Sequence, residues 1–303
     1  MEQVSTSKKV VNKKVKIFLI VFFLFIVTIL VFIYNSNNEI QLTYYKFKNY
    51  NAQNKVKIVH ISDLHQKYFG KNNKNLIKKI KNEKPDLIFI TGDIASFSSD
   101  KMKILNDKSL SIYNANLDYI MKTLKKIQPL APTYFVLGNH EHVFEKFDDG
   151  FSRFKQIVNN ANVELLINEE KTVKVGDTNI NILGVDNTDY KDVTINNMVK
   201  NFENKNGLKI ILDHYPTDFA LNGYFSYKNY DIDYVFSGHE HGGQIRIPFI
   251  GGIFSHEEGL LPKYAEGVHV VKNSTLIISR GLGNSIIPIR LFNRPQLVVV
   301  EIN

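Results

Sequence analysis

The chain has 303 residues, of which 44% are apolar, and it contains no cysteine. A chain of this length and composition can bury a full hydrophobic core, so we exclude an intrinsically disordered protein. The absence of cysteine excludes disulfides, thiolate metal sites and cysteine nucleophiles, so any metal must be held by His, Asp, Glu or Asn.

The net charge of +8 is unevenly distributed along the chain. Residues 1–16 carry five lysines against one glutamate, which accounts for half of the excess. The remainder is spread over a long sequence and does not define a nucleic-acid-binding face, so we do not expect nucleic acid as a partner.

Residues 17–34, IFLIVFFLFIVTILVFIY, form an uncharged apolar run close to the ~20 residues that a helix needs to cross a bilayer. Lysines precede the run and no Ala-x-Ala-like cleavage pattern follows it. We therefore predict a cytoplasmic basic tail at 1–16, a single-pass anchor in the cell membrane at 17–34, a polar linker at 35–38 and an extracytoplasmic domain at 39–303.

Short apolar runs alternate with helical stretches along this domain. The runs have the length and composition of buried strands: VKIVHIS from 56, LIFITG from 87, TYFVLG from 133, INILGV from 180, KIILDH from 209, YVFSG from 234 and LVVVEI from 297. Between them, Leu76, Ile77 and Ile80 share one face of a predicted helix. Leu117, Ile120, Met121 and Leu124 share one face of the next. This order predicts a layered α/β domain.

Metal-ligating residue types recur just past the carboxyl ends of these runs. They are Asp63, His65, Asp93, Asn139, His140, His214, His239 and His241. Within ISDLH and SGHEH, two ligand types lie two residues apart, which in an extended segment places both side chains on the same side. Because the carboxyl ends of strands in an α/β sheet converge on one crevice, we expect these side chains to meet in a single site.

The ordered set D-x-H, G-D, G-N-H-E, a lone His and G-H-x-H resembles the calcineurin-like metallophosphoesterase family over nearly the whole domain. The resemblance implies a four-layer αββα sandwich, in which helices flank two mixed β-sheets. It also implies two divalent cations, either Mn, Fe or Zn. One would be bound by Asp63, His65 and His241, and the other by Asn139, His214 and His239. Asp93 would bridge them, and His140 would act beside them as proton donor or transition-state stabiliser.

This family assignment implies hydrolysis of a phosphate ester or pyrophosphate bond by a hydroxide that bridges the two metals. The segments GGQIRIPFIGG, SRGLGNS and IRLFNRPQLVVVEI are similar to a membrane-associated bacterial branch that includes UDP-diacylglucosamine pyrophosphatases. We therefore predict a phosphorylated small-molecule or lipid-linked cell-envelope substrate. One alternative is an extracytoplasmic phosphodiesterase or nuclease acting on soluble substrates; a non-catalytic metal-binding module is a third, disfavoured by the complete ligand set.

Several other polar residues have simpler interpretations. His60 lies inside a strand and is predicted to be packed and hydrogen-bonded, while Glu141 and Asp213 are either structural or supports for a neighbouring ligand. Arg280 and Arg290 are better explained as solvent-exposed loop residues than as phosphate ligands. The sequence leaves the oligomeric state open.

Overall fold

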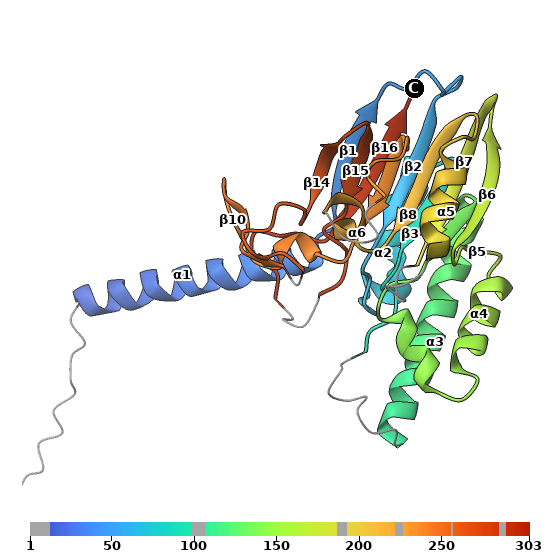
Figure 1. The fold of residues 1–303 in the computed structure, drawn as a ribbon. Helices are drawn as coiled ribbons and strands as arrows, with labels where there is room; N and C mark the ends of the chain where they lie inside the picture. The colour runs from blue at the N-terminus through green and yellow to red at the C-terminus, as the bar shows by residue number, and fades with distance from the viewer. Residues whose placement is uncertain (1–12, 98–106, 187–192, 222–226, 256, 285–288) are drawn as a thin grey trace, which may run out of the picture.

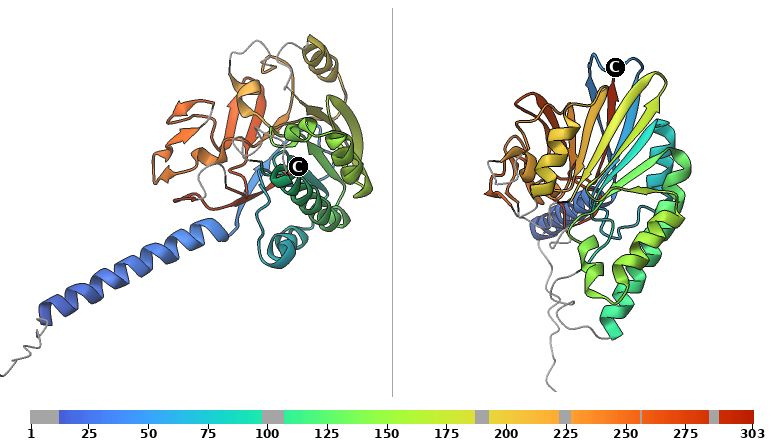
Figure 2. Two further views of the ribbon diagram at one scale, coloured as in Figure 1. Left: turned by 90° about the horizontal axis from the view of Figure 1, so that it is seen from below. Right: turned by 45° about the vertical axis from the view of Figure 1, so that its right-hand side comes forward.

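A computed structural model describes residues 13–97, 107–186, 193–221, 227–255, 257–284 and 289–303. Two six-stranded sheets lie face to face, and helices cover the outer face of each (Figures 1 and 2). One long helix, α1, projects away from this body (Figure 1). The predicted four-layer αββα sandwich, preceded by one apolar helix, is confirmed.

The first sheet has the strand order β1-β16-β2-β3-β4-β5. β16 runs antiparallel to β2, and the other neighbouring strands of this sheet are parallel. Its strands are β1 (Gln41–Phe47), β2 (Val56–Ile61), β3 (Leu87–Thr91), β4 (Thr133–Val136), β5 (Glu164–Leu165) and β16 (Gln296–Ile302).

The second sheet has the order β14-β15-β9-β8-β7-β6. Its four inner strands are parallel to one another, while β14 and β6 pair antiparallel at the two edges. Its strands are β6 (Glu169–Val175), β7 (Thr178–Val185), β8 (Leu208–Asp213), β9 (Tyr234–Ser237), β14 (Gly267–Val271) and β15 (Ser274–Ile278).

The hydrophobic core lies in three layers because both faces of each sheet are covered. Ile58 and Phe89 of the first sheet pack against Ile182 and Phe236 of the second. The residues that follow Ile58 and Phe89 in sequence point the other way, toward the helices, as the two-residue period of a strand requires. Burial on both faces is why these strands read as continuous apolar runs in the sequence.

Five helices cover the two sheets. The first sheet packs against α2 (Lys74–Glu83), α3 (Asp107–Ile127) and α4 (Gly150–Asn160), and the second against α5 (Val193–Phe202) and α6 (Pro216–Ala220). The apolar faces predicted for α2 and α3 are buried, except that Ile77 and Met121 at their margins are only partly buried. Two small hairpins follow β9: β10 (Arg246–Ile247) pairs with β11 (Gly251–Gly252), and β12 (Phe254–Ser255) pairs with β13 (Gly259–Leu260).

Helix α1 (Lys13–Asn38) is long and apolar enough to cross a membrane, and nearly all of its side chains are exposed. It does not end at Tyr34, because the segment predicted as a polar linker forms its last turn. The Nδ2 atoms of Asn37 and Asn38 donate to the carbonyls of Ile33 and Tyr34, at 2.7 and 2.9 Å. These side-chain bonds add to the backbone hydrogen bonds of the last turn, in which each N–H already pairs with the carbonyl four residues earlier.

Candidate metal centre

The eight predicted site residues lie in five loops at one end of the two sheets. The loops follow β2, β3 and β4 in the first sheet and β8 and β9 in the second. β2, β3 and β4 are mutually parallel, as are β8 and β9, so each set brings its carboxyl ends to the same edge. The structure therefore brings the predicted side chains together, as strand order alone indicated.

The backbone of these loops is strained at five of the eight residues. Asp63, His65, Asp93, His239 and His241 all have φ between 43° and 68°, in the left-handed region. The expectation that each two-apart pair lies on an extended segment is wrong, since both members of each pair are left-handed. Such a conformation costs a non-glycine residue roughly 1–2 kcal/mol, and strain of this kind clusters at functional sites.

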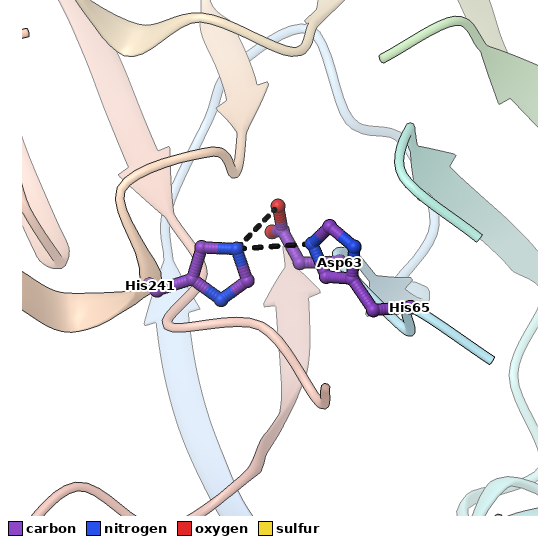
Figure 3. A group of neighbouring side chains, drawn as sticks. All are labelled: Asp63, His65 and His241. Carbon is purple, nitrogen blue, oxygen red and sulfur yellow. Dashed lines mark hydrogen bonds and ion pairs between the residues drawn. The ribbon is translucent and has the colours of Figure 1, made fainter. Parts of the chain in front are cut away.

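Asp63, His65 and His241 form the first half of the site (Figure 3). The Nε2 atoms of the two histidines are 3.0 Å apart, and His241 Nε2 is 3.6 Å from Asp63 Oδ1. Two ligand atoms about 2.1 Å from one cation lie roughly 3.0–3.6 Å apart at angles of about 90–120°, the range of four- and five-coordinate sites, so this spacing fits a shared ion. Burial lowers the pKa of His65 to about 3 and that of His241 well below its usual value, which leaves both rings neutral and able to ligate.

Asp93, Asn139, His214 and His239 form the second half. His214 Nε2 is 3.2 Å from Asn139 Oδ1, 3.4 Å from Asp93 Oδ2 and 3.1 Å from His239 Nδ1. The ring of His214 is oriented by its Nδ1, which donates to the carbonyl of Thr91 at 2.7 Å. Its Nε2 is thus turned toward oxygen atoms that can only accept, which is the arrangement that a cation requires.

The charges around His214 also fit the binding of a divalent cation. Burial by itself lowers the pKa of His214, but the nearby carboxylates of Asp93 and Asp63 outweigh burial and raise it to about 10. A proton on Nε2 therefore relieves the contact between Nε2 and the acceptor oxygens. A divalent cation placed between the same atoms would replace that proton and neutralise the carboxylates more fully.

One oxygen of Asp93 lies between the two halves. Asp93 Oδ1 accepts the backbone N–H of His140 at 2.9 Å, which fixes the direction of the carboxylate. Asp93 Oδ2 is then 3.4 Å from His214 Nε2 and 3.6 Å from His65 Nε2, so it faces a ring from each half. This position suits the predicted bridging ligand.

His140 stands at the open side of the site. Its Nε2 is 3.9 Å from Asp93 Oδ2, and its side chain is 22% exposed, so a substrate can reach it. Its Nδ1 accepts the backbone N–H of Phe97 at 2.8 Å. Since a backbone N–H can only donate, the single proton of the neutral ring resides on Nε2, the atom that faces the site.

Sequence reasoning missed the full role of Glu141, which lies completely buried behind the site. Its Oε2 accepts the backbone N–H groups of Asp93 and Gly138 at 2.7 and 2.9 Å, and its Oε1 accepts that of Ala95 at 2.9 Å. One carboxylate thus holds two of the ligand-bearing loops together. Its place directly after the G-N-H motif was the available signal, but the sequence does not show where its oxygens point.

Arg290 was also misjudged, because it is not the solvent-exposed loop residue that the sequence indicated. It is fully buried. Its Nε donates to the carbonyl of Gly283 at 2.8 Å, and its Nη2 lies 3.4 Å from His241 Nδ1. His60, in contrast, is buried and bonded to Thr91 Oγ1 at 2.7 Å, as predicted.

Comparison with known proteins identifies similar chains. A model of the calcineurin-like phosphoesterase family matches residues 56–243. The chain is 28% identical to the uncharacterized metallophosphoesterase YkoQ of Bacillus subtilis, over 83% of this chain and 85% of that protein. It is 27% identical to the UDP-2,3-diacylglucosamine pyrophosphatase LpxG of Chlamydia muridarum, over 81% and 83%. It is 23% identical to the phosphodiesterase YaeI of Escherichia coli, over 73% and 71%.

Proposed function

The chain belongs to the calcineurin-like phosphoesterase family and is a metal-dependent phosphohydrolase, and from this premise we propose that it works with two divalent cations at the outer surface of a cell membrane. The observation that carries the proposal is the position of Asp93 Oδ2 between two groups of ligand atoms. Asp63, His65 and His241 would hold one cation, and Asn139, His214 and His239 the other, with Asp93 shared.

A cation pair held in this way lowers the pKa of a water molecule and neutralises the oxygens of a phosphoryl group, which promotes attack at phosphorus. The protein contributes only two negative charges, those of Asp63 and Asp93, because the imidazoles and the amide are neutral ligands. An anionic phosphate ester or pyrophosphate therefore meets a centre of net positive charge.

We assign His140 the role of hydrogen-bond donor to the phosphoryl or leaving-group oxygen. The Phe97 amide keeps Nδ1 as an acceptor, so only Nε2 presents a proton toward the substrate. Of the two predicted roles, stabilisation of the transition state by a hydrogen bond fits this geometry better than full proton transfer.

The anchor supports an envelope substrate. Helix α1 would place the domain next to the membrane. LpxG, to which the chain is similar, is named for action on a lipid-linked pyrophosphate. The cations would be Mn, Fe or Zn. We therefore propose a lipid-linked phosphate or pyrophosphate as the substrate. The similarity to the phosphodiesterase YaeI favours the second candidate, a phosphodiesterase acting on soluble esters.

The test uses the full chain in detergent micelles, with metal content and hydrolysis measured for wild type, Asp93→Asn and the control Asp118→Asn. Asp118 has a half-exposed side chain paired with Lys122, far from the metal-ligand loops in sequence. We expect about two metals per wild-type chain and a fall in activity of more than about 100-fold in Asp93→Asn alone, since even residues that only support a ligand cost 10–100-fold. An Asp93→Asn variant with normal activity would refute the bridging role.

Substrate class is resolved in the same preparation by comparing a lipid pyrophosphate with soluble aryl phosphate monoesters and diesters. Turnover of the lipid pyrophosphate without turnover of the soluble esters supports the envelope substrate. Turnover of the soluble esters without turnover of the lipid pyrophosphate would instead assign to the chain the activity of a phosphodiesterase on soluble esters.

A further inference from the structure

Exposed apolar side chains gather in two loops beside the carboxyl end of α1. Phe249 is fully exposed and Ile250 is 63% exposed in the turn between β10 and β11, while Ile247 and Phe292 are 41% and 50% exposed. We call these four residues the hairpin surface. Scattered exposed apolar residues are ordinary, but a contiguous group of this kind marks an interaction site.

The hairpin surface is in contact with α1. The ring of Phe292 packs on that of Phe32, with centroids 4.8 Å apart. A cavity is lined by Phe32 and Ser36 on the helix side and by residues 247–251 on the hairpin side. Figure 1 and the view from below in Figure 2 show the β10 hairpin standing apart from α1 but on the side of the domain from which the helix emerges.

The relative position of the two parts is fixed by hydrogen bonds to one side chain of α1. Asn37 Nδ2 donates to the carbonyl of Arg290 at 3.2 Å, and Asn37 Oδ1 accepts the backbone N–H of Arg290 at 2.9 Å. Since Phe292 lies two residues after Arg290, the loop that carries it cannot move far from the helix while these bonds persist.

The contact with Phe32 sets the depth of the hairpin surface. Phe32 lies two residues before the end of the apolar run 17–34, which at 1.5 Å per residue is about 3 Å along the helix axis. The run has nearly the length needed to cross the hydrocarbon core, so its end lies near the boundary between acyl chains and headgroups. Side chains that touch Phe32 lie at about the same level.

The charges nearby are compatible with this depth. In residues 244–254 the one charged side chain is Arg246, and it is paired with Glu266. Arg294 lines the same cavity and is paired with Glu39 at 3.4 Å. Apart from Gln244, the remaining side chains of residues 244–254 are apolar or small, and aromatic and aliphatic residues are favoured at the membrane interface.

We propose that the hairpin surface inserts into the outer interfacial layer of the same bilayer that α1 crosses. The inference rests on the proposed membrane placement of α1 but not on catalysis. The hairpin begins five residues after His241, so this second contact holds the His241 half of the metal centre near the lipid headgroups. A lipid-linked phosphate could then reach the site without leaving the membrane.

The test exploits the absence of tryptophan from the chain. Full-length Phe249→Trp and Tyr50→Trp each carry one tryptophan and are reconstituted in phosphatidylcholine vesicles with or without brominated acyl chains. The two positions are matched, because both side chains are fully exposed. Tyr50 lies between β1 and β2, at the opposite end of the first sheet from the metal centre. Phe25→Trp, within α1, reports insertion of the anchor.

We expect brominated lipid to quench Phe249→Trp at least about two-fold more strongly than Tyr50→Trp, with emission shifted to the blue, as for side chains buried 5–10 Å into the interface. Quenching of Phe25→Trp with none of Phe249→Trp would leave the anchor intact and overturn the proposal. A blue shift of Phe249→Trp without quenching would indicate a protein partner or a second copy, and would also overturn it. Absence of quenching of both Phe25→Trp and Phe249→Trp would refute the anchor and the inference together.

Discussion

Replacing Glu141 with glutamine tests whether one buried carboxylate holds the metal-ligand loops in place. The substitution keeps the size and shape of the side chain but exchanges one acceptor oxygen for an NH₂ group. Glutamine can still accept the N–H groups of Asp93 and Gly138 through its remaining oxygen. Its NH₂ group would then face the N–H of Ala95, so that two donors meet in a buried position.

The expected loss of stability in Glu141→Gln follows from these contacts. The variant loses one hydrogen bond to a charged acceptor, worth about 1.5–3 kcal/mol, and leaves a buried donor unpaired at about 1–3 kcal/mol. Part of this cost is offset because burial, together with the charge of Asp93, raises the pKa of Glu141 to about 7, so the native carboxylate is itself expensive to ionise. We expect the free energy of unfolding to fall by about 2–4 kcal/mol, and metal affinity to fall by about 10–100-fold as Asp93 loses its support.

The assay is urea unfolding of the full chain in micelles, combined with hydrogen exchange of the peptides that contain Asp93, Ala95 and Gly138. We expect a lower unfolding midpoint and faster exchange at these three amides in Glu141→Gln. The matched control is Glu164→Gln, whose half-exposed carboxylate pairs with Lys171 at 3.2 Å and contributes less than about 1 kcal/mol. The reasoning is refuted if Glu141→Gln unfolds like wild type and its three amides exchange at the native rate.

Three further outcomes are expected. Removal of metal with a chelator should lower the Tm measured by differential scanning calorimetry by several degrees, and re-addition of metal should restore it. The reason is that each cation present at 100 times its Kd stabilises the fold by about 2.7 kcal/mol. An unchanged Tm would contradict a bound metal. Gly238→Ala should abolish stoichiometric metal binding measured by atomic emission, because a Cβ there lies 1.8 Å from Ser62 Oγ and 2.5 Å from Asp63 Oδ2. Gly259→Ala should retain the metal, because its Cβ meets nothing within 4 Å and the substitution adds only the local strain of a φ of 76°. Burial lowers the pKa of His142, but Asp186 and a second carboxylate outweigh it and raise the pKa to about 9. A raised folded-state pKa gives stability that is complete below the usual value of 6.5 and is lost as the pH rises through about 9. His142→Gln should therefore cost about 1–2 kcal/mol at pH 6 and almost nothing at pH 10 in urea unfolding, after allowance for solvent screening; a pH-independent difference would contradict this assignment.

The fold and the gathering of the site residues could be predicted because both follow from short-range patterns and one topological rule. Apolar runs of strand length indicate buried strands, and the carboxyl ends of parallel strands meet at one edge. Residues as distant as Asp63 and His241 were placed together on this basis alone. Their roles as ligands remain predictions, supported by the distances between their donor atoms.

Local backbone geometry could not be predicted in the same way. The left-handed conformations of His65 and His239 depend on how each loop leaves its strand and on the hydrogen bonds that hold it. The sequence indicated polar residues in 35–38, but it could not show that Asn37 and Asn38 fold back to extend α1 by a turn. Glu141 was ambiguous for a similar reason, since its partner Asp93 lies 48 residues away in another loop.

Arg290 shows how such unpredicted contacts connect the anchor to the site. Its backbone N–H and carbonyl both bond the side chain of Asn37 in α1, and its guanidinium lies against His241 and the carbonyl of Gly283. A single residue therefore touches both the end of α1 and a predicted metal ligand. If α1 served only as a tether, a flexible linker would suffice and no such contact would be needed. The continuous helix and the buried arginine instead fix the orientation of the metal centre relative to α1, as a substrate presented by the membrane would require.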